Sequence, residues 1–193
     1  MRYGSREWFV ATPEKIRAES RRRRFAKVGG LDVLEPATEE EAAVMWAQMR
    51  GEEKREALDA GGDESSHRKA VLSAERSFAI YHGDALLAVA TVDTLPDGRK
   101  FLSMERTAAA LERGHRFTWL RAYGPLGLTI GSECPDGIWA VTPTDLPRAL
   151  DVYRHAGARP TGETVRVGER EYWVLRIGGS EWPRGGRNGK LRH

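Results

Sequence analysis

The stretch that decides the fold is WAVTPTDLPRALDVYRHAGARP, residues 139–160. It opens with a short apolar run typical of a buried strand, and Thr142-Pro143 favours the start of a helix directly after it. Gly157 is expected to adopt the left-handed conformation that ends such a helix. One helix face carries the i, i+3, i+4, i+7 spacing of apolar residues, namely Leu146, Ala149, Leu150 and Tyr153. The stretch therefore predicts a strand and a helix that turns Tyr153 toward the interior.

The flanking segments predict a sheet with helices before and between its strands. Four further strands or hairpins are expected, at 31–36, 77–95, 99–104 and 164–177. Helices are expected at 13–28, 52–60, 65–75 and 106–122. Another helix is expected to begin at the capping box formed by Thr38 and Glu41. This order predicts an α+β or mixed α/β fold, with one central sheet between helices.

Composition and charge predict one domain with basic ends. The 193 residues are 40% hydrophobic, which suffices for a single core. Residues 1–30 carry nine Lys/Arg and three Glu, and residues 178–193 carry four Lys/Arg and one Glu, so the ends hold +6 and +3. The net charge is +3, and residues 31–177 therefore hold −6. We expect a basic N-terminal helix (1–30), a central domain (31–177) and a basic tail (178–193) that meet an acidic partner or stay solvated.

Other features of the sequence exclude some classes of site. One cysteine, Cys134, allows no internal disulfide, and the five histidines have no paired spacing typical of a metal site. The first ten residues lack the apolar run of a secretory signal, and no run is long enough to span a membrane. The expectation is a protein of the cytoplasm, without a metal or a membrane partner.

The element order resembles the GCN5-related N-acetyltransferase (GNAT) fold over residues 31–177. DVLEPATEEEAAVMWAQM, residues 32–49, is similar to that family's first strand and helix, and residues 139–160 are similar to its fifth strand and following helix. The family's Tyr-x-x-x-Gly-Phe pattern reads Tyr153 to Ala158 here. The resemblance implies a sheet that splays to admit acetyl-CoA, with Tyr153 as the general acid that protonates the leaving thiolate. It also implies cofactor contacts at Val141, Thr142 and Arg106. The alternative reading of Tyr153 is a core aromatic residue.

The family's pyrophosphate loop has no clear counterpart in the sequence. That loop reads Arg/Gln-x-x-Gly-x-Gly/Ala, because side chains would keep the phosphate away from the backbone N–H groups. Residues 105–117, ERTAAALERGHRF, contain no glycine before Gly114, which lies too far along an expected helix. The family's Asn after the fifth strand is replaced by Thr142 to Asp145. We therefore expect a degraded site that binds no cofactor.

A narrower resemblance leads to the preferred hypothesis. Residues 48–62, 77–92 and 101–117 are similar, in order, to three segments of an acetyltransferase-like family of tailed phages, which implies a role in virion assembly or structure. The preferred hypothesis is a non-enzymatic phage protein, in the host cytoplasm or the virion, that docks to other virion proteins or to itself. The expected docking residues are Trp8, Arg21, Arg22, Arg23, Arg24, Trp182, Arg184 and Arg187.

Two alternatives stay open. The first is a working N-acyltransferase that uses acetyl-CoA and Tyr153. The second is an accessory protein that binds nucleic acid through its basic ends.

Overall fold

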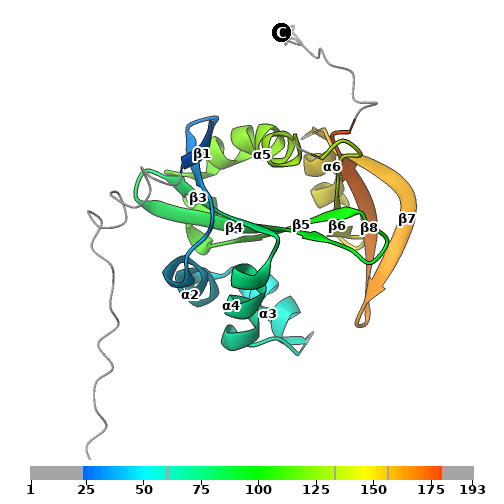
Figure 1. Cartoon of the computed structure of the whole chain (residues 1–193), viewed down its shortest axis with the longest axis horizontal. Coiled ribbons are helices and arrows are strands. Elements are labelled where there is room, and N and C mark those ends of the chain that lie inside the picture. The colour runs from blue at the N-terminus through cyan, green and yellow to red at the C-terminus, as the bar shows by residue number, and fades with distance from the viewer. Residues whose placement is uncertain (1–23, 60, 133, 156, 180–193) are drawn as a thin grey trace, which may run out of the picture.

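The computed structural model describes residues 24–59, 61–132, 134–155 and 157–179, and its centre is one eight-stranded sheet (Figure 1). The strands lie in the order β1 (Arg24–Val28), β2 (Leu31–Leu34), β3 (Arg76–His82), β4 (Ala85–Thr94), β5 (Lys100–Arg106), β6 (Ile138–Pro143), β8 (Arg170–Ile177) and β7 (Arg159–Val167). Neighbouring strands are antiparallel except β5 and β6, which are parallel. This is the mixed sheet that the sequence predicts.

The sheet opens between β5 and β6. These strands are paired only at Phe101 and Trp139, whereas β4 and β5 are paired residue by residue from Ala88–Arg106 to Thr94–Lys100. We call the Phe101–Trp139 pair the seam. Arg99 and Arg176, one from each half of the sheet, lie with their guanidinium carbons 5.8 and 5.3 Å from the centre of the Trp139 ring. Beyond the seam the two halves of the sheet diverge.

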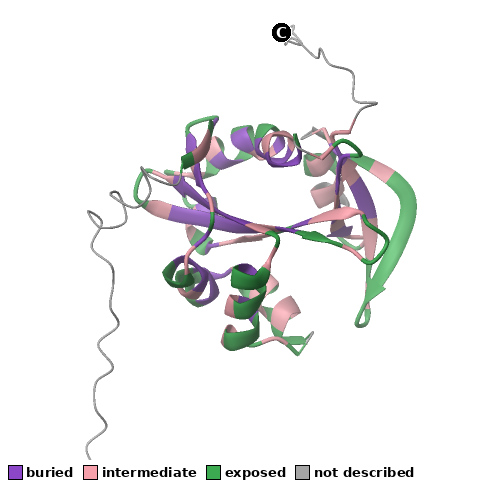
Figure 2. Cartoon of the chain, in the orientation of Figure 1, coloured by how far each residue is buried: buried purple, intermediate pink, exposed green. Residues whose placement is uncertain are grey.

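Helices cover both faces of the sheet (Figure 1). One face carries α2 (Glu39–Gln48), α3 (Gly51–Asp59) and α4 (Glu64–Ser73), and the other carries α5 (Arg116–Gly131) and α6 (Pro147–His155). A short 3-10 helix, η1 (Ala108–Leu111), connects β5 to α5. The central strands are buried along most of their length, and β7 is exposed (Figure 2).

Each face of the sheet has its own core. Trp119 and Leu126 of α5 pack with Phe78 and Leu175 on one side, and Met45 and Trp46 of α2 pack with other apolar residues on the opposite side. Burying one such large apolar side chain stabilises the fold by about 1.5–3 kcal/mol, before entropy is counted. The capping box that the sequence predicts starts α2: the N–H of Glu41 donates to Thr38 Oγ1 at 3.2 Å, and the N–H of Thr38 donates to Glu41 Oε2 at 2.7 Å.

The helix expected at 13–28 is wrong over its last five residues, which form β1. Phe25 packs against Phe78, with ring centroids 5.2 Å apart, so the strand contributes to the core. Gly29 and Gly30, with φ of 56° and 93°, make the hairpin turn to β2 instead of ending a helix. A glycine pair suits either role, because glycine takes positive φ without steric cost. The rest of the expected helix, and the tail from 180, lie outside the described residues.

The helix expected at 106–122 is wrong at its start. Residues up to Arg106 extend β5, and α5 begins only at Arg116. The hydroxyl of Thr107 is buried and donates to the carbonyl oxygen of Leu86 at 2.8 Å, which holds this segment against β4. Gly114 therefore lies in the turn before α5 and not inside a helix. Among the described residues, no helix combines the length and hydropathy needed to cross a membrane.

Candidate active site at the split in the sheet

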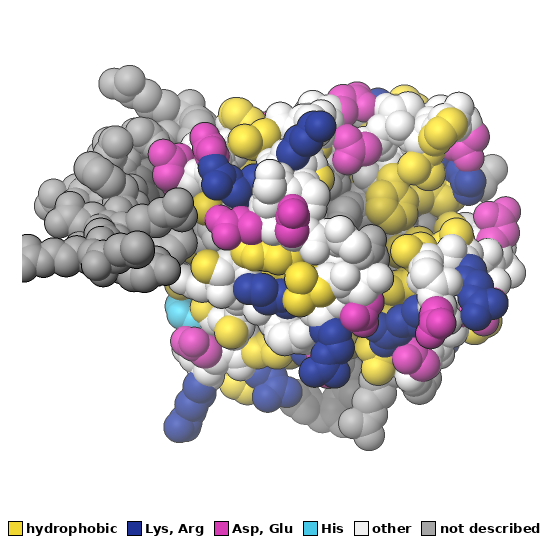
Figure 3. Space-filling model, turned by 90° about the horizontal axis from the view of Figure 1, so that it is seen from below, with side chains coloured by type: hydrophobic (Ala, Val, Ile, Leu, Met, Phe, Trp, Pro, Cys, Tyr) yellow, Lys and Arg dark blue, Asp and Glu magenta, His cyan; other side chains and the backbone are white. Residues whose placement is uncertain are grey.

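A cavity of about 710 Å³ occupies the place where β5 and β6 diverge. Its walls come from β5, β6, β8, α3, α5 and α6, so both halves of the sheet contribute. On the face seen from below in Figure 3, hydrophobic side chains gather in a hollow bordered by basic and acidic side chains. An apolar cavity with a few polar groups is typical of a small-molecule site.

All four residues that the resemblance implies for the site line this cavity. Tyr153 comes from α6, Val141 and Thr142 from β6, and Arg106 from the end of β5. Gly157 has a φ of 88° and ends α6 as predicted, and the N–H of Ala158 donates to the carbonyl oxygen of Tyr153 at 2.9 Å. The structure thus brings together residues that lie up to 47 positions apart, from Arg106 to Tyr153.

Tyr123 of α5 is a second cavity-lining phenol, and the sequence analysis missed it. Its ring contacts Tyr153 edge to face, with centroids 5.4 Å apart at 72°, and contacts Trp119 at 5.6 Å. Burial and then Tyr153 raise the pKa of Tyr123 well above its ordinary value, while Arg106 acts in the opposite direction. The helix was expected to stop at 122, but the spacing of four between Trp119 and Tyr123 was a usable signal.

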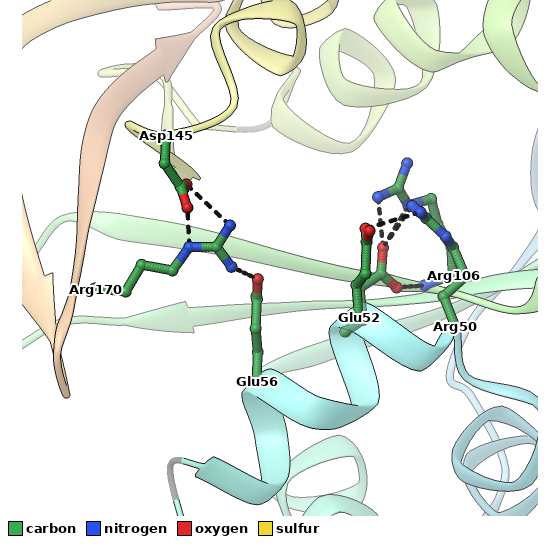
Figure 4. Close-up of polar contacts among 7 residues, drawn as sticks. Arg50, Glu52, Glu56, Arg106, Asp145 and Arg170 are labelled. Carbon is green, nitrogen blue, oxygen red and sulfur yellow. Dashed lines mark hydrogen bonds and ion pairs between the residues drawn. The ribbon is translucent and has the colours of Figure 1, made fainter.

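Arg106 is held by a carboxylate of α3 (Figure 4). Glu53 accepts hydrogen bonds from the backbone N–H and the Nε of Arg106, both at 2.7 Å, and lies 3.6 Å from Nη1 of Arg50. Burial alone would lower the pKa of Arg106, but the Glu53 carboxylate, together with Tyr123 and Tyr153, outweighs it and leaves that pKa above its ordinary value. Arg106 is therefore a fixed positive charge in the cavity wall.

A second arginine links the two halves of the molecule across the split. Arg170 of β8 donates to Asp145, at 3.2 Å from Nε and 2.9 Å from Nη2, and also pairs with Glu56 of α3 (Figure 4). Asp145 follows β6, so the bridge joins α3 to the far wall of the cavity. Arg170 and Glu56 lie more than 100 positions apart in the sequence, so no local sequence pattern predicts this ion pair.

The turn before α5 differs from the sequence expectation. Because α5 begins at Arg116, the segment Arg113 to Thr118 falls in frame with the Arg-x-x-Gly-x-Gly pattern, but Arg116 and Thr118 replace its two glycines. No side chain caps α5 at His115, although the N–H of Arg116 donates to the carbonyl oxygen of Glu112 at 2.9 Å, so an anion would meet the N–H groups that follow it. Gly114 has open space around it, with no atom within 4 Å of an added Cβ. The glycine pair is absent, and arginines stand at Arg113 in the turn and at Arg116, the first residue of the helix.

The docking residues expected at the basic ends receive no structural support. Arg24 lies in β1 and pairs with Asp32 at 3.1 Å. The other seven lie outside the described residues. In the part of the chain that the structure describes, no group of three or more His, Cys, Asp or Glu side chains could hold a metal ion.

Comparison with solved structures shows that the chain has the GNAT fold. It is similar to a GNAT-family acetyltransferase from Bacillus anthracis (12% identity, TM-score 0.57, 78% of this chain and 96% of that chain). It is also similar to a putative GNAT-family acetyltransferase from Bordetella pertussis (14%, 0.59, 81% and 100%). A third similar structure is AAC(6')-Ib in complex with ribostamycin and coenzyme A (14%, 0.53, 75% and 93%). No family model and no curated protein sequence matches the chain.

These comparisons correct the preferred functional hypothesis. Two of these similar structures are described as GNAT-family acetyltransferases, and the third holds coenzyme A. The hypothesis of a non-enzymatic phage structural or assembly protein is therefore wrong, and the comparisons favour the acyltransferase alternative. Nothing in them supports the narrower phage resemblance. The sequence argument failed because it took the missing glycine pair, which is absent in the structure too, as evidence against any cofactor site.

Proposed function

We propose that the protein is an N-acyltransferase that uses acetyl-CoA to acylate an amine. The observation that carries this proposal is the cavity at the split in the sheet. Residues from both halves of the sheet line it, and Tyr153 is one of them. Similar structures with coenzyme A or acetyl-CoA bound support the same cofactor here.

The residues that would hold the cofactor come from two elements. The unpaired edge of β6, at Val141 and Thr142, offers backbone groups to the pantetheine amides, because β5 pairs with β6 only at the seam. Arg113, Arg116 and the first-turn N–H groups of α5 would hold the pyrophosphate. Without the two glycines, side chains limit how closely a phosphate can approach the backbone N–H groups. The two arginines and the start of the helix would compensate for this loss.

The catalytic contribution of the chain centres on Tyr153. When bound, acetyl-CoA supplies an acyl group activated as a thioester. Tyr153 lies in the cavity wall, where its hydroxyl would donate a proton to the departing sulfur. Burial raises the pKa of Tyr123, so its hydroxyl stays protonated, and its edge contact with Tyr153 orients that ring. The fixed charge of Arg106 favours the Tyr153 phenolate that is left after donation.

Calorimetric titration with acetyl-CoA tests this proposal. We expect a dissociation constant in the micromolar range, which corresponds to about −8 kcal/mol. Reduced CoA serves as the comparison ligand, and release of free thiol from acetyl-CoA in the presence of a panel of primary amines measures turnover. Millimolar or weaker binding of acetyl-CoA by the full chain would overturn the proposal.

A further inference from the structure

We infer that the Glu53 carboxylate competes with the cofactor for a hydrogen-bond donor on β5, so that α3 must release this donor before the cofactor can bind. The contested donor is the backbone N–H of Arg106. The ligand atoms that would use it are the carbonyl oxygens of the pantetheine arm. This inference rests on the proposed function, and it concerns entry of the cofactor rather than acyl transfer.

The backbone of Arg106 faces the split and not β4. The N–H of Thr107, the next residue, donates to the carbonyl oxygen of Leu87 in β4 at 2.9 Å. Because backbone groups alternate along a strand, those of Arg106 point to the opposite edge of β5. β6 pairs with β5 only at the seam, so this edge borders the cavity that Arg106 lines. A ligand that pairs with the free edge of β6 would meet the edge of β5 on its other side.

The two oxygens of Glu53 have different partners. Oε1 accepts from Nε of Arg106 at 2.7 Å and lies 3.6 Å from Nη1 of Arg50. Oε2 accepts from the backbone N–H of Arg106, also at 2.7 Å. A carboxylate oxygen accepts this N–H more strongly than an amide or thioester carbonyl oxygen does, because it carries charge. The cofactor must therefore displace Oε2, whereas Oε1 can stay on the guanidinium group.

Backbone contacts hold the segment before α3 against β5 and mark where the helix would pivot. The N–H of Arg50 donates to the carbonyl oxygen of Arg106 at 3.1 Å, and Met49 pairs with Thr107 in an isolated antiparallel bridge. Gly51 follows as the first residue of α3, and no atom lies within 4 Å of a Cβ added there. A glycine at the end of an element can absorb a backbone rotation. Rotation at Gly51 would lift the carboxylate off the N–H and leave the preceding residues in place.

The other contacts of α3 also allow the helix to move. None of its residues is buried, so movement exposes little apolar surface. Glu56 pairs with Arg170, but Arg170 also binds Asp145 at 2.9 Å and keeps that carboxylate when α3 moves away (Figure 4). Lys54 donates to the carbonyl oxygen of Trp46 at 3.0 Å through a flexible side chain that can follow the helix. The bond from Arg106 N–H to Glu53 is thus the contact that matters for entry.

The first test measures acetyl-CoA binding by calorimetric titration. Glu53→Ala frees the N–H, so the dissociation constant should fall about tenfold or more, the factor expected when a charged competitor is removed. Glu53→Gln keeps an uncharged acceptor oxygen and should give a smaller gain. Glu52→Ala is the matched control, because Glu52 also pairs with Arg50 but is 73% exposed, and its affinity should stay within about twofold of wild type. Equal or weaker binding by both Glu53 variants would overturn the inference.

The second test follows amide hydrogen exchange in the wild-type chain by NMR. Without added ligand, the Arg106 amide should exchange slowly, because Glu53 accepts its hydrogen. Addition of acetyl-CoA should quicken exchange across α3, while the Arg106 amide stays protected by its new acceptor. Slower exchange across α3 on addition of acetyl-CoA would overturn the inference, since it would show that the helix closes on the cofactor.

The two tests separate this inference from the proposed function. Tight binding of acetyl-CoA that is the same in wild type and in Glu53→Ala would leave the proposed function standing and overturn the inference alone. An Arg106 amide that exchanges freely without ligand would do the same. Failure of wild type and of both Glu53 variants to bind acetyl-CoA would instead overturn the proposed function, and the inference with it.

Discussion

The chemistry proposed for this site depends on single residues, above all on Tyr153. Its helix position places the ring in the cavity wall, and its edge contact with Tyr123 fixes the ring plane. The sequence pattern located Tyr153 correctly from helical spacing and from Gly157. It could not distinguish a general acid from a core aromatic residue, because both lie on the buried face of a helix. The cavity beside the ring supports the proposed role of general acid, which the substitution below tests.

Replacing Tyr153 with Phe removes the hydroxyl and keeps the ring. We expect acyl transfer to slow about 100-fold or more, since general acid catalysis contributes at least that factor. Binding of acetyl-CoA should be nearly unchanged. The rate of thiol release at saturating acetyl-CoA measures the effect, with Tyr172→Phe, another cavity-lining phenol, as the control. Equal losses in both variants would point to general damage to the cavity.

Tyr123 also predicts how stability depends on pH. Burial and Tyr153 raise its pKa in the folded chain, whereas the unfolded chain keeps a value of about 10. Below that pH both states hold the proton and the contribution is fully present. As the pH rises through 10, only the unfolded state loses the proton, so stability falls. Urea unfolding between about pH 8 and 11 should show a steeper loss for wild type than for Tyr123→Phe. Parallel curves would contradict the assignment.

Among the secondary-structure elements, α3 has the weakest attachment. None of its residues is buried, and Ala57 makes only a partial contact with the core below it. Its links to the cavity walls are ionic, from Glu53 to Arg106 and from Glu56 to Arg170. Partly exposed ion pairs contribute about 0–1 kcal/mol and weaken in salt. The wall of the cavity on the α3 side is therefore held by charge, while the α5 side is held by apolar packing.

Glu56→Gln should loosen α3 without unfolding the protein. We expect amide hydrogen exchange to quicken across α3 and to stay unchanged in α5, because the lost pair tethers only α3. High salt should bring the wild-type chain close to the variant. Arg55→Gln, at an exposed position of the same helix, is the control and should leave exchange as it is. Exchange rates that are insensitive to both the substitution and salt would show that α3 is held by other contacts.

Elements that depend on a local sequence pattern were predicted correctly, whereas elements that depend on contacts between distant residues were missed. The capping box at Thr38 and the β3–β4 hairpin are local patterns, and the structure confirms both. The strand at 24–28 was missed because its arginine-rich approach suits a helix, and only packing of Phe25 on Phe78 decides the outcome. The late start of α5 was missed because the Thr107 bond to Leu86 is a long-range contact.

Over the whole molecule, the sequence predicted the fold better than the function. The order of strands and helices was enough to predict a sheet between two helical layers. The ion-pair network of Arg106, Glu53, Arg170 and Glu56 could not be predicted, since its members are scattered over three elements. The hydrogen bond between His67 of α4 and Glu105 of β5 is equally non-local. Conclusions about activity drawn from one missing glycine pattern were therefore weaker than conclusions about topology.

The seam at Phe101 and Trp139 also has a mechanical consequence. In a continuous sheet, hydrogen bonds along every pair of strands oppose a change in the angle between them. Here the two halves of the sheet are joined by a single residue pair between β5 and β6. Three side chains gather at this pair, because the guanidinium groups of Arg99 and Arg176 both lie against the ring of Trp139. Repacking at these three positions could widen or narrow the gap without breaking any other rung of the ladder.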